Sequence, residues 1–199
     1  MESIRQSDIT RMKILEAAYA EIHRHGFQGA SIANILASTG LTKGALYYHF
    51  PTKHALGLAV VDEIIQERLS RLFFEPLRVS PNPVETLLAI LENVPDRVHE
   101  FIPLGCPMNN LMQEMSPIDP QFRAHLSGVL NKWLTSIEQA LQRGQAIGTL
   151  KSDMDCRATA LFIVSAWEGC IGTAKNLQSI EVLLSCGRQL QAYIRSLMK

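Results

Sequence analysis

The stretch GLTKGALYYHF (residues 40–50) decides the fold of this chain. Gly40 interrupts the preceding segment, Thr42 is a candidate N-cap for a new helix, and Pro51 ends that helix after two turns. A core helix does not begin with a lysine and a glycine, and a flexible loop does not carry a leucine, two tyrosines and a phenylalanine. The stretch therefore predicts a short helix with little side chain at its N-terminal end, suited to meeting another surface.

Outward from this stretch, the sequence predicts a helix-turn-helix arrangement. A first amphipathic helix ends near Gly26, which is a natural C-terminal cap. Ser31 is a candidate N-cap for a two-turn helix over residues 32–38, and the helix over residues 43–49 follows the turn at Gly40. This order of helices is the plan of a helix-turn-helix, whose second short helix enters the major groove of duplex DNA.

The second short helix carries side chains suited to DNA. The major groove is about 12 Å wide, and the N-terminal residues of a recognition helix meet the base edges inside it. Gly44 and Ala45 permit a close approach, and Lys43 can reach a guanine edge or a phosphate. Tyr47 and Tyr48 can each offer a hydroxyl to a phosphate oxygen, although tyrosines at this spacing can also be core residues.

Three more residues extend the predicted DNA surface. Ser31 and Thr42 stand at helix N-termini, where hydroxyls and free backbone N–H groups attract anions. Lys53 begins the following helix and can bind another phosphate. Each has a structural alternative, because the two hydroxyls can serve as caps alone and the lysine can be solvated. The residues expected to face inward and hold the short helices together are Phe27, Ile32, Ile35, Leu46 and Phe50.

Residues 26–56, GFQGASIANILASTGLTKGALYYHFPTKHAL, resemble the DNA-binding head of the tetracycline-repressor family. The shared pattern comprises Ser31-Ile32-Ala33-x-Ile35, Gly40, Lys43-Gly44-x-Leu46-Tyr47-x-His49-Phe50 and Lys53, with Ser31 standing where threonine is more usual. With that pattern included, the predicted DNA-binding residues are Ser31, Thr42, Lys43, Gly44, Ala45, Tyr47, Tyr48, His49 and Lys53.

The resemblance implies a three-helix head joined through a fourth helix to a six-helix ligand-binding body. It also implies a homodimer that binds a pseudo-palindromic double-stranded DNA operator, represses transcription and is released by a small-molecule effector. The sequence identifies neither the effector nor the operator and target genes, and it leaves open activation in place of repression.

The whole chain agrees with an all-α protein. Its 199 residues are 47% hydrophobic, and their helical periodicity predicts about nine helices and no sheet. We expect a DNA-binding domain over residues 1–52 and an effector-binding and dimerisation domain over residues 53–199. The net charge is zero, but residues 1–55 carry six Lys/Arg against four acidic residues, which favours a binding head on a neutral body. The chain has no apolar run of 18 residues and no apolar leader, so we expect a cytoplasmic protein without a membrane span.

The last two predicted helices indicate a dimer interface. The helix over residues 155–175 is apolar or small on nearly all faces, and the helix over residues 179–197 is amphipathic. A helix that is apolar all round is buried on several sides, and its small residues allow close approach. We therefore expect a four-helix seam with two helices from each subunit, the alternative being that both helices are merely core.

Cys106 is the cysteine placed for reactivity. Pro107 suits a first helical turn, so Cys106 stands at the N-cap, where the helix dipole and free N–H groups lower the pKa of a thiol. The sequence around Cys106 and Lys175 also resembles a branch of the family in which some members respond to electrophiles or oxidants through a cysteine near a lysine. The alternative is that Cys106 is a small buried residue.

Non-covalent sensing is the other possibility for the body. An apolar cavity between helices could hold a hydrophobic or aromatic effector, with walls from Phe101, Met112, Trp133 and Trp167 and polar contacts from Asn110 or Glu168. Each of these residues has plain core packing as its alternative role. The sequence leaves covalent and non-covalent sensing both open.

Other function classes find little support in the sequence. The four cysteines form no CxxC pair and no metal-spaced set with histidine, so we expect neither a zinc site nor a disulfide framework, and no cofactor. No catalytic constellation occurs at usable spacing, and the nearest cluster, Asp96, His99 and Glu100, lies on a predicted amphipathic helix, so we expect no enzyme activity. The remaining alternative is a helical protein-protein interaction module that does not bind DNA.

Overall fold

The computed structural model describes residues 6–93 and 102–199, and within those ranges the chain is helical. The predicted all-α class is confirmed, because the described residues form no strand beyond a single isolated bridge between Leu150 and Met198. The helices pack into two compact units. One comprises the described residues up to Glu67 together with Asn110–Val129, and the other comprises those from Arg68 to Asn109 together with Leu130–Lys199. The functional boundary expected near residue 52 stays a prediction.

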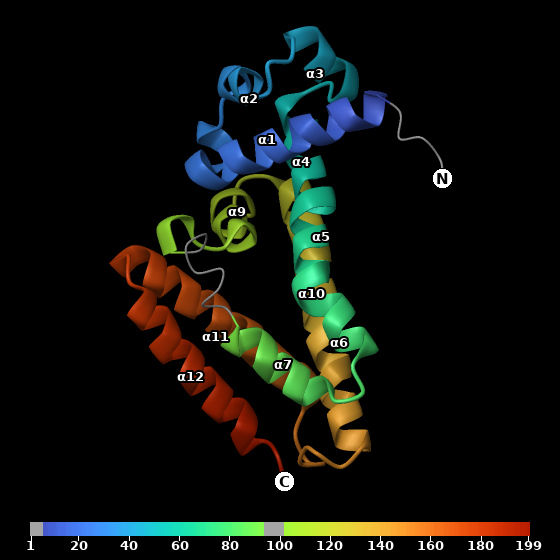
Figure 1. Cartoon of the computed structure of the whole chain (residues 1–199), viewed down its shortest axis with the longest axis vertical. Helices are drawn as coiled ribbons and strands as arrows, with labels where there is room; N and C mark the ends of the chain where they lie inside the picture. Colours follow the sequence, from blue (N-terminus) through green and yellow to red (C-terminus); the bar gives the residue numbers. More distant parts are fainter. Residues whose placement is uncertain (1–5, 94–101) are drawn as a thin grey trace. The chain divides into compact units, whose positions relative to one another are not determined.

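The first unit is built on three helices followed by a long helical segment. They are α1 (Gln6–Gly29), α2 (Ile32–Thr39), α3 (Lys43–His49) and α4 (Lys53–Ala59). Helix α1 packs against α2, α3 and α4, as Figure 1 shows. Four of the five residues predicted to face inward are buried (Phe27, Ile35, Leu46 and Phe50), and Ile32 is half-buried. The predicted helix-turn-helix arrangement is therefore present in the first unit.

Two glycines set the turns that separate these helices. Gly26 has φ 74° and interrupts α1, which resumes for one more turn to Gly29. Gly40 has φ 66°, in the left-handed region that favours glycine, and its N–H donates to the carbonyl of Leu36. The helix ends predicted at these two positions are thus explained by backbone conformations that other residues adopt at a cost.

A long helical segment follows Pro51 and runs from Lys53 to Val79. Helix α4 continues through a wide π-type turn over Val60–Ile65 into α5 (Gln66–Leu69), and through a second wide turn over Ser70–Phe74 into α6 (Glu75–Val79). Pro76 lacks an N–H and cannot continue an ordinary α-helical ladder. The second wide turn comes immediately before it, with the Glu75 N–H bonded to the Ser70 carbonyl, so the segment continues past the proline.

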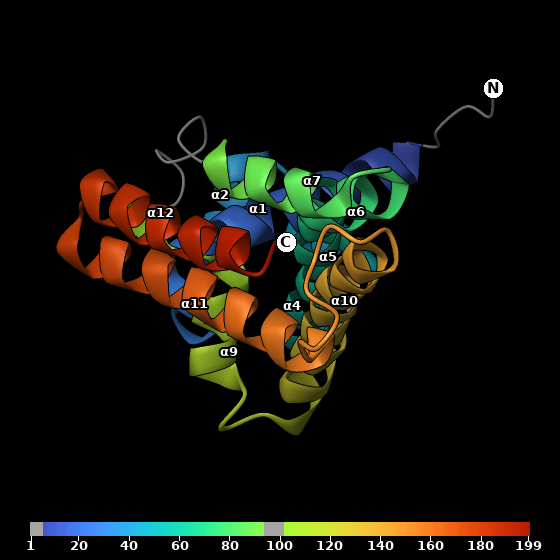
Figure 2. The same ribbon diagram turned by 90° about the horizontal axis from the view of Figure 1, so that it is seen from below.

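The second unit contains the two helices predicted at the end of the chain. They are α11 (Cys156–Leu177) and α12 (Ile180–Ser196), and Asp155 and Ser179 cap them by accepting hydrogen bonds from backbone N–H groups. These helices lie side by side in both views, with α12 also against α7 (Pro83–Glu92) (Figures 1 and 2). The remaining helices, α9 (Pro107–Met115) and α10 (Pro120–Ala146), contribute residues to both units.

The cysteines differ from the prediction. Cys170 and Cys186 form a disulfide that joins α11 to α12, so the expectation of no disulfide is wrong at this pair, while Cys106 and Cys156 are free and buried. The two bonded residues lie 16 positions apart on different helices, and only the packing of those helices brings their Cα atoms to 5.7 Å. Within the described ranges, no cluster of three His, Cys, Asp or Glu residues is placed to hold a metal ion. No helix in those ranges is long and apolar enough to cross a membrane.

Replacing Gly57 with alanine should destabilise the first unit by about 1–3 kcal/mol, because its packing leaves no room for a methyl group. A Cβ at Gly57 would lie 2.5 Å from Phe27 Cε2 and 2.7 Å from Phe122 Cζ. Thermal unfolding of Gly57→Ala measures the effect. The matched control is Gly128→Ala on α10, where nothing lies within 4 Å. Equal melting temperatures for the two variants would contradict this packing.

Candidate nucleic-acid interface and ligand cavity

Helix α3 presents its polar and aromatic face to solvent. Lys43 and Gly44 are exposed at its N-terminal end, Tyr47 is 40% exposed and Tyr48 is 80% exposed. The Lys43 ammonium lies 6.0 Å from the centroid of the Tyr47 ring. The core alternative for Tyr48 is therefore excluded, and its ring is available to a partner of the first unit.

The packing of the first unit does not require a glycine at position 44. A Cβ there would meet only the Thr42 Oγ1 atom, at the ordinary contact distance of 3.9 Å. Glycine in the interior of a helix costs about 0.8–1.0 kcal/mol relative to alanine, which sets an upper limit for Gly44 in the first turn of α3. The helix thus bears this cost without a reason inside the fold, which favours a reason outside it, namely a surface that approaches the backbone of α3.

The two predicted hydroxyl contacts differ in their local roles. The Thr42 hydroxyl accepts a hydrogen bond from the Ala45 N–H at 3.2 Å and so caps α3. Ser31 stands at the N-cap of α2 but makes no capping bond with its side chain. Its N–H donates to Glu21 Oε1 at 3.1 Å, which fixes the backbone there. Capping alone can therefore explain the Thr42 hydroxyl, whereas the Ser31 hydroxyl does not cap its helix.

Lys53 and His49 are more closely tied to the first unit than predicted. The Lys53 ammonium donates to the Gln28 carbonyl at 3.1 Å and lies 4.9 Å from the centroid of the Phe27 ring. It therefore supports the end of α1, a role that competes with the predicted phosphate contact. His49 is half-buried, and its ring packs edge-on against Tyr48 with centroids 5.0 Å apart.

A second group of residues, which the sequence did not reveal, fixes the end of α1. Both carboxylate oxygens of Glu114 accept backbone hydrogen bonds, one from Phe27 and one from Gln28, at 2.8 Å each. A Cβ at Gly26 would lie 2.8 Å from this carboxylate, so the glycine is needed for the close approach. No periodicity or motif signals this contact, because its partners are 86 and 87 residues apart.

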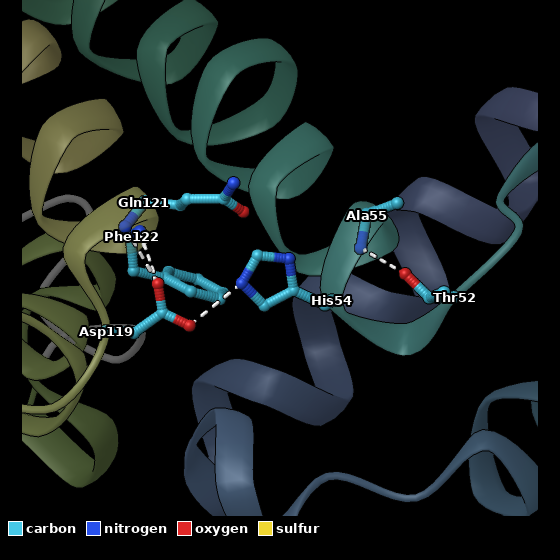
Figure 3. Close-up of polar contacts among 6 residues, drawn as sticks. All are labelled: Thr52, His54, Ala55, Asp119, Gln121 and Phe122. Carbon is cyan, nitrogen blue, oxygen red and sulfur yellow. Dashed lines mark hydrogen bonds and ion pairs between the residues drawn. The ribbon is translucent and has the colours of Figure 1, made fainter.

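Figure 3 shows another long-range contact inside the first unit, between the side chains of His54 and Asp119. His54 Nε2 lies 2.8 Å from Asp119 Oδ2, while Asp119 Oδ1 accepts from the N–H groups of Gln121 and Phe122. The hydrogen bond from the Phe122 backbone N–H lowers the pKa of Asp119, and the contact with His54 acts in the same direction. Partial removal of water from the carboxylate opposes this shift but is outweighed. The carboxylate thus caps α10 and orients His54.

The second unit contains a cavity of about 450 Å³. Its volume lies within the range of about 300–1,000 Å³ typical of small-molecule sites. The lining is mostly apolar and aromatic and comes from α5 to α7, α10 and α11 together with the N-terminal end of α9. The lining residues are Leu69, Arg71, Leu72, Phe73, Pro76, Thr86, Ala89, Ile90, Asn93, Cys106, Trp133, Trp167, Glu168 and Ile171.

Half of the predicted sensor residues line this cavity. Cys106, Trp133, Trp167 and Glu168 do so, whereas Lys175 does not, and Phe101 lies outside the described residues. Asn110 and Met112, on α9, are not among the residues that line it. The sequence missed the contribution of Thr86 and Ile90 on α7 and of its C-cap Asn93, because the periodicity of this helix predicts only a buried face.

Glu168 is the unusual group in the cavity. Its side chain is buried, with 7% of the residue exposed, and neither carboxylate oxygen has a hydrogen-bonding N or O partner among the described residues. The polar group that acts on it is the Cys106 thiol, a weak donor. Burial disfavours the charged form and raises the pKa of Glu168 to about 7.

Of the two roles considered for Cys106, the structure opposes the reactive thiolate and agrees with the small buried residue. Burial, followed by the nearby Glu168 carboxylate, raises the pKa of Cys106 well above its usual value. The N–H groups of Asn109 and Met108 act in the predicted direction, as expected at a helix N-terminus, but they are outweighed. Lys175 is not among the groups that perturb the thiol. Cys106 therefore lines the cavity as a neutral thiol.

Comparisons with known proteins agree with the helical layout. Residues 14–60 match the family described as "Bacterial regulatory proteins, tetR family", and residues 83–189 match "Tetracyclin repressor-like, C-terminal domain". The chain is 32% identical over 177 residues to an uncharacterized HTH-type transcriptional regulator in the lacX 3'region of Lactococcus lactis subsp. lactis, covering 88% of each chain. It is 26% identical over 166 residues to the HTH-type transcriptional repressor DhaR of Mycobacterium sp. (strain GP1), covering 81% of this chain and 80% of the relative.

A solved structure is similar over nearly the whole chain. It is that of a TetR transcriptional regulator from Chloroflexus aurantiacus J-10-FL, with a TM-score of 0.86 and 30% sequence identity. The match covers 98% of both chains, so the similarity includes the helix-turn-helix and the helices that line the cavity.

Neutralising Glu168 should change how stability depends on pH. The pKa of Glu168 in the folded protein, about 7, lies above the ordinary value of 4.5, so the folded protein retains a proton that the unfolded chain releases. Below about pH 4.5 the protonated Glu168 does not reduce the free energy of unfolding. As the pH rises from 4.5 to 7, the free energy of unfolding of the wild type should fall by on the order of 3 kcal/mol relative to that of Glu168→Gln. Urea unfolding of both proteins across this range measures the difference. Parallel stability curves would contradict the buried carboxyl.

Proposed function

Because the chain belongs to the tetracycline-repressor family, we propose that α3 reads operator DNA and that the cavity beside Glu168 holds the controlling effector. Membership of this family makes the protein a DNA-binding transcriptional repressor with a C-terminal ligand-binding domain. The similar proteins are transcriptional regulators, and nothing among them favours the alternative of an interaction module that does not bind DNA.

The proposal for α3 depends on one observation above all, the exposed glycine at position 44. Its helix bears a glycine that its own packing does not need, at the end where a recognition helix meets base edges. Gly44 and Ala45 allow the helix backbone to approach the groove floor, and the exposed Lys43 reaches a guanine edge or a phosphate. These three residues account for base contact.

The aromatic end of α3 is proposed to contact the DNA backbone. The hydroxyls of Tyr47 and Tyr48 donate to phosphate oxygens on either side of the groove, which fixes the register without reading sequence. The Ser31 hydroxyl and the N-terminus of α2 add a phosphate contact. Thr42 and Lys53 act mainly through structure, since one caps α3 and the other supports the end of α1.

Regulators of this family bind operator DNA and dimerise, and we place the dimer seam on α11 and α12. A row of small and apolar residues at helical spacing is exposed along α11. The row comprises Ala158, Leu161, Phe162, Ser165, Gly169 and Gly172. Leu161 and Phe162 are 53% and 51% exposed, and a Cβ at Gly169 or Gly172 would meet nothing within 4 Å. Such a face is suited to close packing against the same face of a second copy.

The effector is proposed to act by occupying the cavity of the second unit. A repressor is released when the effector binds the conformation with low DNA affinity more tightly than the conformation that binds DNA. The cavity is large enough for a small organic molecule and presents a few polar groups among aromatic walls. A bound effector would therefore shift the helices that line the cavity toward the conformation with low affinity for DNA.

Gly44→Ala should weaken operator binding at least tenfold and leave the melting temperature unchanged or higher, because only the bound DNA would meet the added methyl group. Fluorescence anisotropy with the DNA fragment upstream of the protein's own gene measures the affinity at low salt. Gly128→Ala adds the same group to another helix and should bind like the wild type. An unchanged affinity for Gly44→Ala would refute the proposed close approach.

Leu161→Glu should convert the dimer to a monomer at micromolar concentration, because it places a charge in the centre of the proposed seam. Sedimentation equilibrium measures the mass. Ile147→Glu is the control, since Ile147 is exposed to a similar degree, 55%, outside the row on α11. A Leu161→Glu protein that stays dimeric would contradict a dimer interface on this face of α11.

A further inference from the structure

The cavity of the second unit holds three buried polar atoms that lack a conventional partner among the described residues. They are both carboxylate oxygens of Glu168 and the indole N–H of Trp133. More than about nine in ten buried polar atoms in folded proteins are hydrogen-bonded, so three such atoms in one cavity are exceptional. Both residues line the cavity, and their three polar atoms are buried in its wall, so a small side-chain movement would bring an acceptor pair and a donor within reach of an occupant.

The chemistry of these atoms defines what fits. A carboxylate accepts hydrogen bonds and attracts positive charge, whereas the indole N–H only donates. The rings of Trp133, Trp167 and Phe73 form aromatic walls, with the Phe73 and Trp133 centroids 4.9 Å apart. Aromatic faces attract organic cations, and they do so best when water is excluded. Donors near Glu168, an acceptor near Trp133 and a hydrophobic body therefore describe the complementary ligand.

We propose that the effector is an organic cation, a protonated amine on an aromatic or apolar body, whose ammonium group binds Glu168. A hydroxyl, ether or carbonyl oxygen on the same molecule accepts the hydrogen bond of Trp133. This inference rests on the proposed function of the cavity and narrows it to one chemical class.

Among the described residues that line the cavity, no other charged group supplies this cation. Of the cavity-lining residues, those with ionisable side chains are Arg71, Cys106 and Glu168. The Arg71 side chain is exposed to solvent, and the raised pKa of Cys106 keeps its thiol neutral. Glu92 and Arg188 line a separate, smaller hollow that shares Trp167. A ligand carboxylate in the position of the proposed ammonium would therefore meet the Glu168 carboxylate, and a purely apolar ligand would leave the three polar atoms unpaired.

Binding of an amine is linked to the proton on Glu168. In the empty cavity the pKa of Glu168 is about 7, so the carboxyl is mostly ionised at pH 8 and mostly neutral at pH 6. An alkylammonium group stays protonated at both pH values, since its pKa is about 10. The ammonium pairs with the ionised form, so the affinity for an amine should fall about tenfold between pH 8 and pH 6.

Tryptophan fluorescence reports occupancy directly, because the chain has two tryptophans and both line the cavity. Three probes share one body and differ in the terminal group, namely 4-phenylbutylamine, 4-phenylbutan-1-ol and 4-phenylbutyrate. Titration of the full-length protein at pH 8 should show the amine binding at least tenfold more tightly than the alcohol, and the acid more weakly than both. Equal affinity for amine and alcohol, or a preference for the acid, would overturn the proposal.

Variants locate the effect at one carboxylate. Glu168→Gln keeps the size of the side chain and should remove both the preference for the amine and its pH dependence. Glu181→Gln neutralises an exposed glutamate on α12 and should change neither. Retention of the amine preference in Glu168→Gln would contradict the assignment. The titration needs no DNA, so a failure of operator binding by the wild type would count against the proposed function and not against the ligand class.

Discussion

The structure depends on holding the seven-residue helix α3 in place while its N-terminal end, with Lys43 and Gly44, stays exposed to solvent. A helix as short as α3 is not stable alone in water, and its bare N-terminal end contributes nothing to a core. Its order comes from Leu46 and Phe50, which are buried in the first unit, and from the Thr42 cap. The end of α1 is fixed in turn by Lys53 and by the Glu114 carboxylate. The exposed face of α3 is therefore held in position by contacts on its opposite side.

The second unit shows the opposite arrangement, in which polar groups are kept inside. Burial in the cavity wall raises the pKa of the Glu168 carboxyl group, because it disfavours the charged form. At neutral pH we therefore expect this group to lower the free energy of unfolding relative to a neutral side chain of the same shape. Functional sites are where proteins tolerate such costs. The same Glu168 explains why Cys106 is a poor nucleophile in this structure, since the neighbouring carboxylate and the burial both oppose a thiolate.

The sequence predicts local features well and long-range ones poorly. Helix ends at Gly40, Thr42, Asp155 and Ser179 were predictable because capping depends on a few adjacent residues. The exposed side of α3 was predictable for the same reason. The Cys170–Cys186 disulfide and the contacts of Glu114 depend on helix packing, and neither leaves a local pattern. The direction of the Cys106 pKa shift was mispredicted because the dipole of its own helix is a local effect, whereas burial and Glu168 come from the fold.

The central claim is that a dimer of this protein inserts two copies of α3 into the major groove of its operator. Hydroxyl-radical footprinting of the wild-type protein on the DNA upstream of its own gene tests this claim most directly. The account predicts two related protected half-sites whose centres are about one helical turn, roughly 10 base pairs, or a multiple of it apart. A promoter fragment without protection, or with one unpaired protected site, would contradict it.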